Sequence, residues 1–336
     1  MTSRLRRSSP GMLGLTRRRR GAGFAYRHEH GGTVEDRQTL DRIASLSIPP
    51  AWKAVWICAD ANGHLQAVGT DAAGRRQYVY HPRWRRLRDA EKHRRTVELG
   101  EALPIARRRV TRALRQRGPT RERVLAAAFR LLDVASFRVG SESYAKENGT
   151  FGLATLRRDH VVLQGDRLTF RYVAKGAQDR VQSFRDPAVA RLVGELLDRD
   201  DPDPDLLSWF DGTWHDVRSS DINAEVAELT GGEFTAKDLR TWNATVLMAQ
   251  LLAAGAPPES ERSRERVIRD CYRRVADYLG DTPAVARTSY VNSRIVALFR
   301  DGVTVPRHVL PKRERALPVH GRVERAVLRL LKDMES

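Results

Sequence analysis

The chain has 336 residues, of which 41% are hydrophobic and 30% charged, and its formal net charge is +18. This composition excludes a wholly disordered chain, and the basic excess is typical of proteins that bind a polyanion, with nucleic acid as the leading partner. A genome that raises arginine everywhere is an alternative source of the charge, although such genomes usually raise Asp and Glu as well.

Cysteine usage and apolar patterning exclude several further classes. Cys58 and Cys271 are the two cysteines, and neither belongs to a Cys-x-x-Cys pair, so we expect no disulfide framework and no zinc site. This usage fits a reducing cytoplasm. No apolar run approaches the roughly 18 residues of a membrane span, and no Walker A loop supports the use of ATP. We therefore expect a cytoplasmic protein that works without membrane, metal or other cofactor.

The first part of the chain is predicted to hold two regions. Residues 1–30 are a basic segment without the apolar run of a secretory signal, and they suit a solvated arm that seeks DNA or, less closely, an organelle transit peptide. Residues 31–105 are predicted to form a β-rich domain. Short alternating runs between about 48 and 81, broken by Asn-Gly and Ala-Gly turns, indicate its strands, and a basic helical stretch follows.

Residues 106–336 are predicted to form a larger and mainly helical domain. A core-facing stripe indicates a helix that begins after Pro119, and its members are Val124, Leu125, Ala128, Leu131, Leu132 and Ala135. Residues 160–184 return to an alternating pattern that predicts three short strands, with Lys175 in the second turn. The whole pattern predicts an α+β fold.

Three helices are predicted toward the end of the chain. The first contains Arg240 on an otherwise apolar face, and the second ends at Gly280. Thr282 and Pro283 then provide a cap and a proline at a first helical position, so Tyr290 is expected roughly two turns into the third helix.

Arg138, Lys175, Arg240 and Tyr290 together suggest phosphoryl transfer. Taken singly, an arginine at a helix end is usually solvated and a tyrosine at helical spacing usually belongs to the core. A phosphodiester attacked by a phenol gathers negative charge on oxygens that two arginines can bind. The leaving alkoxide needs a proton that a lysine on a turn can supply, and the tyrosine can act as a covalent nucleophile.

The chain resembles the small bacterial and viral (poxvirus-type) type IB DNA topoisomerases. The matching stretches, in order, are "TRRRRGAGFAY", "IPPAWKAVWIC", "GRRQYVYHPRW", "FRVGSESYAKENGTFGLATLR", "KDLRTWNATV" and "LGDTPAVARTSYVN". The resemblance implies a small β-rich N-terminal domain and a mainly helical catalytic domain of the type IB topoisomerase/tyrosine recombinase fold. The two domains of such an enzyme form a clamp on duplex DNA, nick one strand without ATP or metal, let the duplex swivel and reseal it. A monomer associated with the nucleoid is the expectation.

The resemblance also implies residue roles. Tyr290 would form a 3′-phosphotyrosyl bond, Arg138 and Arg240 would bind the phosphate, and Lys175 would be the general acid. Tyr78, Tyr80 and Arg88 match positions that contact DNA in the family, and basic residues interleaved with aromatics suit that task. A half-buried strand with a solvated basic face is the alternative reading of that stretch, with Tyr78 and Tyr80 on one face.

The sequence departs from the family at Asp281. The family usually has His or Asn there, which donates a hydrogen bond to the phosphate, whereas an ionised aspartate only accepts and repels it. Two expectations follow: cleavage is slow, or Asp281 is protonated in the complex with DNA. A role for Asp281 as a helix cap is the structural alternative. The surroundings of Lys175 also differ, which leaves Lys146 and Lys237 as alternative basic residues in catalysis or DNA binding. Lys237 precedes Arg240 by one helical turn, so both could face the phosphate.

Two other functions compete with DNA relaxation. A tyrosine recombinase shares the fold and chemistry, but it usually has histidine at the position of Lys237. A catalytically weakened DNA-binding relative is favoured by Asp281. Retention of Tyr290 argues against it, because binding alone needs no nucleophile.

Overall fold

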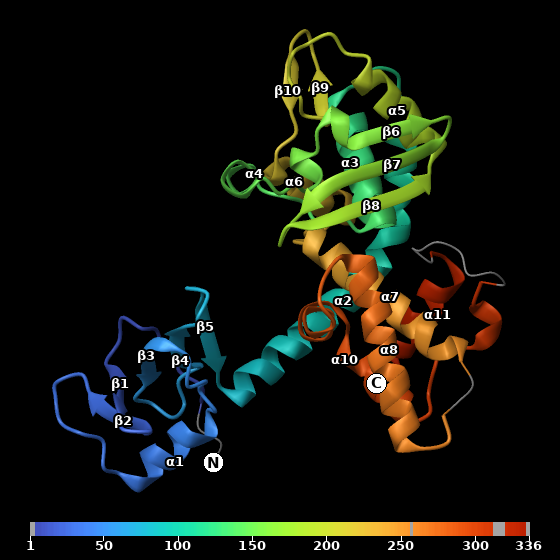
Figure 1. The fold of residues 1–336 in the computed structure, drawn as a ribbon. Helices are drawn as coiled ribbons and strands as arrows, with labels where there is room; N and C mark the ends of the chain where they lie inside the picture. The colour runs from blue at the N-terminus through green and yellow to red at the C-terminus, as the bar shows by residue number, and fades with distance from the viewer. Residues whose placement is uncertain (1–3, 256–257, 312–319, 334–336) are drawn as a thin grey trace. The chain divides into compact units, whose positions relative to one another are not determined.

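The computed structural model describes residues 4–255, 258–311 and 320–333, and the chain divides into two compact units at Lys92/His93 (Figure 1). Sequence patterning had placed the boundary at 105/106, after the basic helical stretch. The division falls earlier because helix α2 (Pro82–Ala113) runs through both units, and its buried residues begin at His93. Each unit has a hydrophobic core of its own.

The N-terminal unit is built on a five-stranded antiparallel sheet in the order β2-β1-β3-β4-β5. Its elements are β1 (Gly14–Arg20), β2 (Gly23–His28), α1 (Arg37–Ser45), β3 (Lys53–Cys58), β4 (Leu65–Thr70) and β5 (Arg76–Tyr80). Leu15, Ile43 and Ile57 are among the buried side chains that join the helix to the sheet. The strands predicted between about 48 and 81 are confirmed.

The basic segment before residue 30 is ordered, in contrast to the expected solvated arm. Residues 14–28 form β1 and β2, and β1 pairs with β3 inside the sheet. Arg17 explains how so basic a strand is held. Its guanidinium donates to the carbonyls of Ile48, Pro49 and Trp52, and it lies 4.1 Å from the ring centroid of Phe24. The Arg17 charge therefore makes contacts within the fold of this unit.

The C-terminal unit is mainly helical. Its helices after α2 are α3 (Arg121–Ala135), α4 (Glu142–Asn148), α5 (Pro187–Leu197), α6 (Ser219–Thr230), α7 (Ala236–Ala254), α8 (Glu261–Leu279), α9 (Pro283–Val285), α10 (Ser293–Arg300) and α11 (Arg322–Lys332). The apolar stripe predicted for α3 is buried throughout, as are Leu239, Val246, Leu247 and Leu251 of α7. No helix in the described parts of the chain is both long and apolar enough to cross a membrane.

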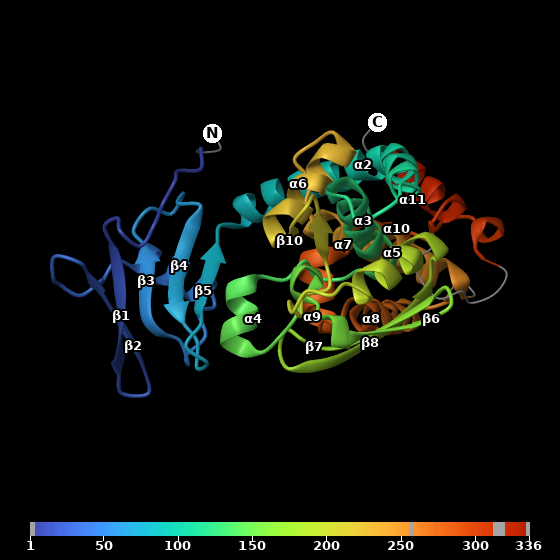
Figure 2. The same ribbon diagram turned by 90° about the horizontal axis from the view of Figure 1, so that it is seen from above.

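A small antiparallel sheet covers one side of α3 (Figures 1 and 2). Its strands β6 (Val161–Gln164), β7 (Arg167–Ala174) and β8 (Gln178–Arg185) occur in that order, as predicted. Leu168 and Phe170 point into the core, and Phe137 meets Phe170 edge to face at a centroid distance of 5.1 Å. A separate hairpin consists of β9 (Ser208–Phe210) and β10 (Trp214–Asp216).

Candidate active site

Arg240 lies in the second turn of α7 with only 3% of its surface exposed. Its Nη2 donates to the carbonyl of Leu279 at 3.0 Å, and its Nη1 donates to the carbonyl of Ser136. Ser136 adopts a left-handed backbone with φ of +50° where α3 ends, which directs that carbonyl toward α7. Main-chain oxygens from two separate segments therefore fix the Arg240 guanidinium.

Arg138 follows the end of α3 and approaches the same place. Its Nη2 donates to the carbonyl of Gly280 at 2.7 Å. The segment that carries Arg138 is held by its own backbone, because its carbonyl accepts from the amide of Leu153 at 2.8 Å. Gly140 and Gly152 pack so closely that a Cβ on Gly152 would lie 2.5 Å from the Cα of Gly140. The backbone around Arg138 is therefore tightly packed and held in place by hydrogen bonds.

The carboxylate of Asp281 bridges these two arginines. Oδ1 accepts from Arg138 Nη2 and Oδ2 accepts from Arg240 Nη2, each at 2.8 Å. The Asp281 side chain is 11% exposed. Its predicted role as a helix cap is wrong, since the cap is Thr282, whose hydroxyl accepts from the amide of Val285 at 3.3 Å. The Asp281 carboxylate lies against the two arginines because they are charged partners. An exposed helix-cap position offers no charged partner.

Tyr290 is the last residue of a π-helical turn, η3 (Ala286–Tyr290), which continues directly from α9. Its hydroxyl accepts from Arg240 Nε at 3.4 Å, and the Arg240 guanidinium carbon lies 5.0 Å from the tyrosine ring centroid. The helix start predicted at Thr282 and Pro283 is confirmed. Single π-helical turns are frequent at functional sites. Tyr290 therefore belongs to the cluster of Arg138, Arg240 and Asp281.

Lys175 occupies the tight turn between β7 and β8, as predicted, and its side chain is exposed. The next two residues, Gly176 and Ala177, have φ angles of +82° and +55°, so the turn uses left-handed backbone conformations. On the same hairpin, Tyr172 is buried, and burial raises its pKa while the nearby charges of Arg180, Arg240 and Arg138 oppose that shift. The turn end of this hairpin, where Tyr172 lies, is therefore close enough to the arginine cluster for its charges to act on Tyr172.

Sequence analysis missed Arg180, which lies on β8. Its Nη1 and Nη2 donate to the carbonyls of Asp277 and Tyr278, both at 2.9 Å. The last carbonyls of a helix have no partner within it, and its C-terminus attracts cations. At the end of α8, three arginines fill this need. The carbonyls of residues 277 to 280 accept, in order, from Arg180, Arg180, Arg240 and Arg138. The strand alternation that places Gln182 and Phe184 inward also places Arg180 inward, and that signal could have identified it.

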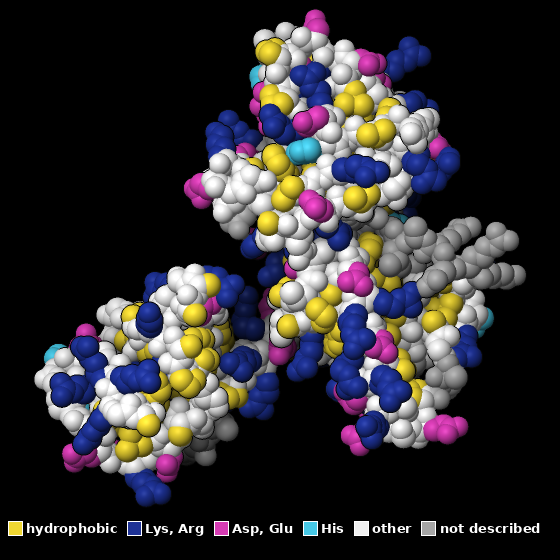
Figure 3. All heavy atoms as spheres, in the orientation of Figure 1, with side chains coloured by type: hydrophobic (Ala, Val, Ile, Leu, Met, Phe, Trp, Pro, Cys, Tyr) yellow, Lys and Arg dark blue, Asp and Glu magenta, His cyan; other side chains and the backbone are white. Residues whose placement is uncertain are grey.

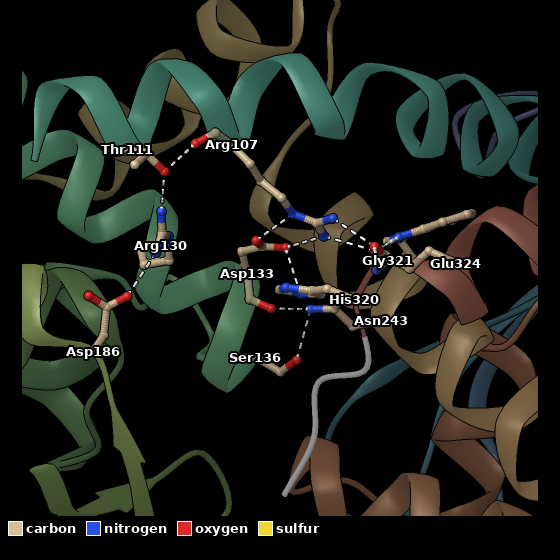
Figure 4. A network of polar contacts seen from close by, with 11 residues as sticks. Arg107, Thr111, Arg130, Asp133, Ser136, Asp186, Asn243, His320, Gly321 and Glu324 are labelled. Atoms are coloured by element: carbon tan, nitrogen blue, oxygen red, sulfur yellow. Dashed lines mark hydrogen bonds and ion pairs between the residues drawn. The ribbon is translucent and has the colours of Figure 1, made fainter. Parts of the chain in front are cut away.

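A second polar network includes Ser136, whose carbonyl accepts from Arg240, and reaches into the core (Figure 4). Asn243, one turn after Arg240 on α7, donates to the carbonyl of Asp133 at 2.9 Å and to Ser136 Oγ at 3.3 Å. The Asp133 carboxylate accepts two hydrogen bonds from Arg107, each at 2.8 Å. Burial alone would raise the pKa of Asp133, but the charge and hydrogen bonds of Arg107 outweigh it and lower that pKa. α3 and α7 are thereby joined next to Arg240.

The predicted DNA contacts of the N-terminal unit lie together on its surface. Tyr78 and Tyr80 of β5 stack with ring centroids 6.2 Å apart, and Tyr78 is 47% exposed. The guanidinium carbon of the exposed Arg88 lies 5.9 Å from the ring centroid of Trp84. His64, which the sequence analysis did not select, packs against both Trp84 and Tyr80. The shared face predicted for the two tyrosines is confirmed.

Lys146 and Lys237 lie on the C-terminal unit and are both exposed. Lys146 is in the last turn of α4, and Lys237 is in the first turn of α7. Arg240, one turn further along α7, is buried, so the two side chains differ in environment although helical spacing brings them near each other. Figure 3 shows further Lys and Arg side chains distributed over the visible face of each unit.

Comparison with known protein families matches residues 81–298 to the family described as "Eukaryotic DNA topoisomerase I, catalytic core". That range spans more than half of the chain. The chain belongs to this family. Residues 23–71 match "Bacterial DNA topoisomerase IB, N-terminal domain". The protein is therefore a type IB DNA topoisomerase, an isomerase that relaxes supercoiled DNA, and the predicted fold class is confirmed.

Individual relatives agree with this assignment. The type IB topoisomerase is 27% identical over 300 residues to "DNA topoisomerase 1B" of Acanthamoeba polyphaga mimivirus, covering 86% of this chain and 88% of the relative. It is 26% identical over 246 residues to "DNA topoisomerase 1B" of Vaccinia virus (strain Copenhagen), covering 72% and 74%. A match to "DNA topoisomerase 1 alpha" of Arabidopsis thaliana is 26% identical and covers 50% of this chain and 18% of that protein. The resemblance to viral enzymes predicted from motifs is confirmed.

Proposed function

We propose that Tyr290 is the nucleophile through which this topoisomerase nicks and reseals duplex DNA. The observation that carries the proposal is the placement of its hydroxyl 3.4 Å from Arg240 Nε, beside a carboxylate that two arginines bind. A phosphodiester has the same charge as that carboxylate and a similar pair of acceptor oxygens. In this proposal, the scissile phosphate takes the position of the Asp281 carboxylate when DNA binds.

Each remaining residue then has a defined task. Arg138 and Arg240 stabilise the charge that gathers on the phosphate oxygens as the Tyr290 oxygen bonds to phosphorus. Lys175, on the exposed turn, gives a proton to the departing 5′ oxygen. The 3′-phosphotyrosyl bond preserves the energy of the broken linkage, so resealing by the 5′-hydroxyl requires no ATP. We expect the reaction to proceed in EDTA.

Asp281 opposes the reaction that its neighbours promote. Its carboxylate holds both arginines at 2.8 Å, so it must yield them before a phosphate can bind there. Once displaced, it still repels the phosphate and cannot donate a hydrogen bond. We therefore propose slow DNA cleavage. DNA binding without cleavage is the second candidate function, and this same bridge is the observation that favours it.

Binding of double-stranded DNA is assigned to exposed and half-buried residues on the surfaces of both units. In the N-terminal unit, Tyr78 and Tyr80 present stacked rings and Arg88 presents a charge, a combination suited to sugar and phosphate contacts. In the C-terminal unit, Lys146 and Lys237 supply further charges. We propose that the enzyme acts as a monomer on the DNA of the nucleoid, because one chain carries the complete set of catalytic residues.

The deciding experiment is relaxation of negatively supercoiled plasmid in EDTA without ATP, with the wild type compared with Tyr290→Phe. We expect relaxation by the wild type and at least a 10³-fold loss in the variant, roughly the loss seen when a nucleophile is removed. Both proteins should bind DNA equally. If neither relaxes the plasmid while both bind it, the binding-only function is supported. If Tyr290→Phe relaxes DNA as the wild type does, Tyr290 is not the nucleophile.

A further inference from the structure

Arg180 connects two parts of the site that carry different steps of the reaction. Through its two hydrogen bonds to Asp277 and Tyr278 it ties β8 to the last turn of α8. That turn leads directly into Gly280 and Asp281, which contact the phosphate-binding arginines. β8 begins at Gln178, directly after the turn that contains Lys175, so Arg180 lies two residues into the strand.

The fit around Arg180 is tight on the side of α8. Gly280 has a φ of +65°, and a Cβ on it would lie 2.8 Å from the Arg180 guanidinium carbon. Glycine is therefore favoured at position 280 for two reasons. It adopts the left-handed conformation at the helix end, and it leaves room for the Arg180 side chain. Arg180 is half-buried, and its pKa is lowered mainly by burial and further by the charges of Arg240 and Arg138.

The strand register relates Arg180 to the turn. Tyr172 of β7 is paired with Arg180 of β8, and the pairing continues to Ala174 and Gln178, immediately before and after the turn. A displacement of Arg180 is therefore transmitted along the paired strands to Lys175. On the inner side, Gln182 also anchors β8, because its amide donates to the carbonyl of Ala135 at the end of α3.

We propose that Arg180 is a positioning residue for proton transfer: by binding the end of α8, it fixes the hairpin and thereby holds Lys175 at the leaving 5′ oxygen. This inference rests on the proposed function, in which Lys175 is the proton donor. In the step concerned, the Tyr290 hydroxyl gives up its proton to water, and the bond from phosphorus to the 5′ oxygen breaks as the bond from the Tyr290 oxygen to phosphorus forms. The proton passes from the Lys175 ammonium to the 5′ oxygen, which leaves as a hydroxyl.

Changing the leaving group shows whether a variant has lost only the positioned proton donor or has suffered general damage to the site. A duplex with sulfur in place of the 5′ oxygen at the cleavage site expels a thiolate, whose conjugate acid has a pKa of about 8.5, so it leaves without protonation. Single-turnover cleavage of the oxygen and sulfur substrates is measured with the wild type, Arg180→Ala, Lys175→Ala and Arg171→Ala. The rate ratio within one preparation cancels any loss of folded enzyme.

We expect Arg180→Ala and Lys175→Ala to cleave the oxygen substrate on the order of 10²-fold more slowly than the wild type. Both should cleave the sulfur substrate within about threefold of the wild-type rate, since that leaving group needs no general acid. Arg171→Ala is the matched control, because it removes an exposed arginine from the same hairpin. It should leave the ratio of the two rates unchanged. Arg180→Lys, which keeps the charge and one donor, should recover part of the rate on the oxygen substrate.

The remaining outcomes overturn one or other proposal. If Arg180→Ala slows both substrates equally, or neither, while Lys175→Ala is rescued by sulfur, the positioning role is wrong and the proposed function stands. If Lys175→Ala is slow on both substrates, Lys175 is not the proton donor. If the sulfur substrate restores the rate of Arg180→Ala but not that of Lys175→Ala, Arg180 does not act through Lys175.

Discussion

At the scale of single residues, the candidate site is governed by a carboxylate that lies between two arginines. Asp281 is held by Arg138 and Arg240 and is largely shielded from water. Two charge-assisted hydrogen bonds stabilise the DNA-free state of the site. If the scissile phosphate binds these arginines as proposed, the same hydrogen bonds oppose its entry, so what stabilises the DNA-free site slows the reaction.

Replacement of Asp281 by asparagine should relieve the conflict. Asp281→Asn removes the charge that repels the phosphate and adds a donor for it. We expect single-turnover cleavage to rise by roughly 10- to 10²-fold, up to the usual effect of one charge-stabilising donor. Asp270→Asn is the control, because it removes an exposed charge of α8 that pairs with Arg273 at 2.8 Å. A rate that stays unchanged or falls in Asp281→Asn would show that Asp281 does not limit cleavage.

At the scale of elements, local patterns predicted the fold better than the arrangement of the site. The buried stripe of α3 and the three strands between 160 and 184 follow from periodicity alone, and both are confirmed. The strands β1 and β2 were missed because their arginines resemble a solvated tail, and only tertiary contacts such as those of Arg17 show otherwise. Propensity does not encode such partners.

The candidate site shows the same division. The positions of Lys175 in a turn and Tyr290 on a late helix follow from turn and cap residues. The convergence of Arg138, Arg240 and Arg180 on the end of α8 does not, because it depends on tertiary contacts. The residues that meet there are 142 positions apart in sequence for Arg138, 97 for Arg180 and 39 for Arg240. The capping role expected for Asp281 is wrong for the same reason. Thr282 caps the helix, and the Asp281 carboxylate instead binds Arg138 and Arg240, which come from other parts of the chain.

Helix α6 provides a prediction about pH. Burial, reinforced by the charges of Glu228 and Glu122 and opposed by Arg121, raises the pKa of Glu225 to about 7 from its ordinary 4.5. The folded state therefore prefers the protonated form. The associated stability is fully present below about pH 4.5 and is lost as the pH rises through 7.

Glu225→Gln, which stays neutral, should be more stable than the wild type at pH 8 by about 1 kcal/mol after allowance for solvent screening. The difference should shrink toward zero as the pH falls to 4.5. Urea unfolding of both proteins at pH 5 and pH 8 measures it. A stability difference that is the same at both pH values would rule out titration of Glu225 as its origin.

At the scale of the whole molecule, the chain continues beyond the catalytic family match, which ends at residue 298. Helix α11 lies in that extension, yet its Glu324 is buried and accepts from Arg107 at 2.8 and 2.9 Å and from Trp242 at 2.8 Å (Figure 4). Burial alone would raise the pKa of Glu324, but hydrogen bonds and charge from Arg107 lower it. The extension is therefore part of the core that supports α7.

Removal of this carboxylate should destabilise the catalytic unit. Glu324→Ala leaves Arg107 with one fewer buried partner and Trp242 with no acceptor from α11, and we expect a loss of about 3 kcal/mol in the free energy of unfolding. Glu101→Ala is the matched control, since it breaks the exposed ion pair between Lys332 of α11 and α2. That pair should contribute less than about 1 kcal/mol. Equal losses in urea unfolding of the two variants would contradict the structural role of Glu324.

The end of α8 has a consequence for how far sequences in this family can diverge. Its arginines are held by main-chain oxygens, and every amino acid at positions 277, 278 and 279 offers the same carbonyl. The contacts to Arg180 and Arg240 therefore do not depend on the identity of these side chains, whereas a side chain at Gly280 would meet the Arg180 guanidinium on a backbone with positive φ. Homologous enzymes could share the arrangement while having little identity in this helix. Residue 281 differs from these positions, because its side chain itself meets the guanidinium groups of Arg138 and Arg240.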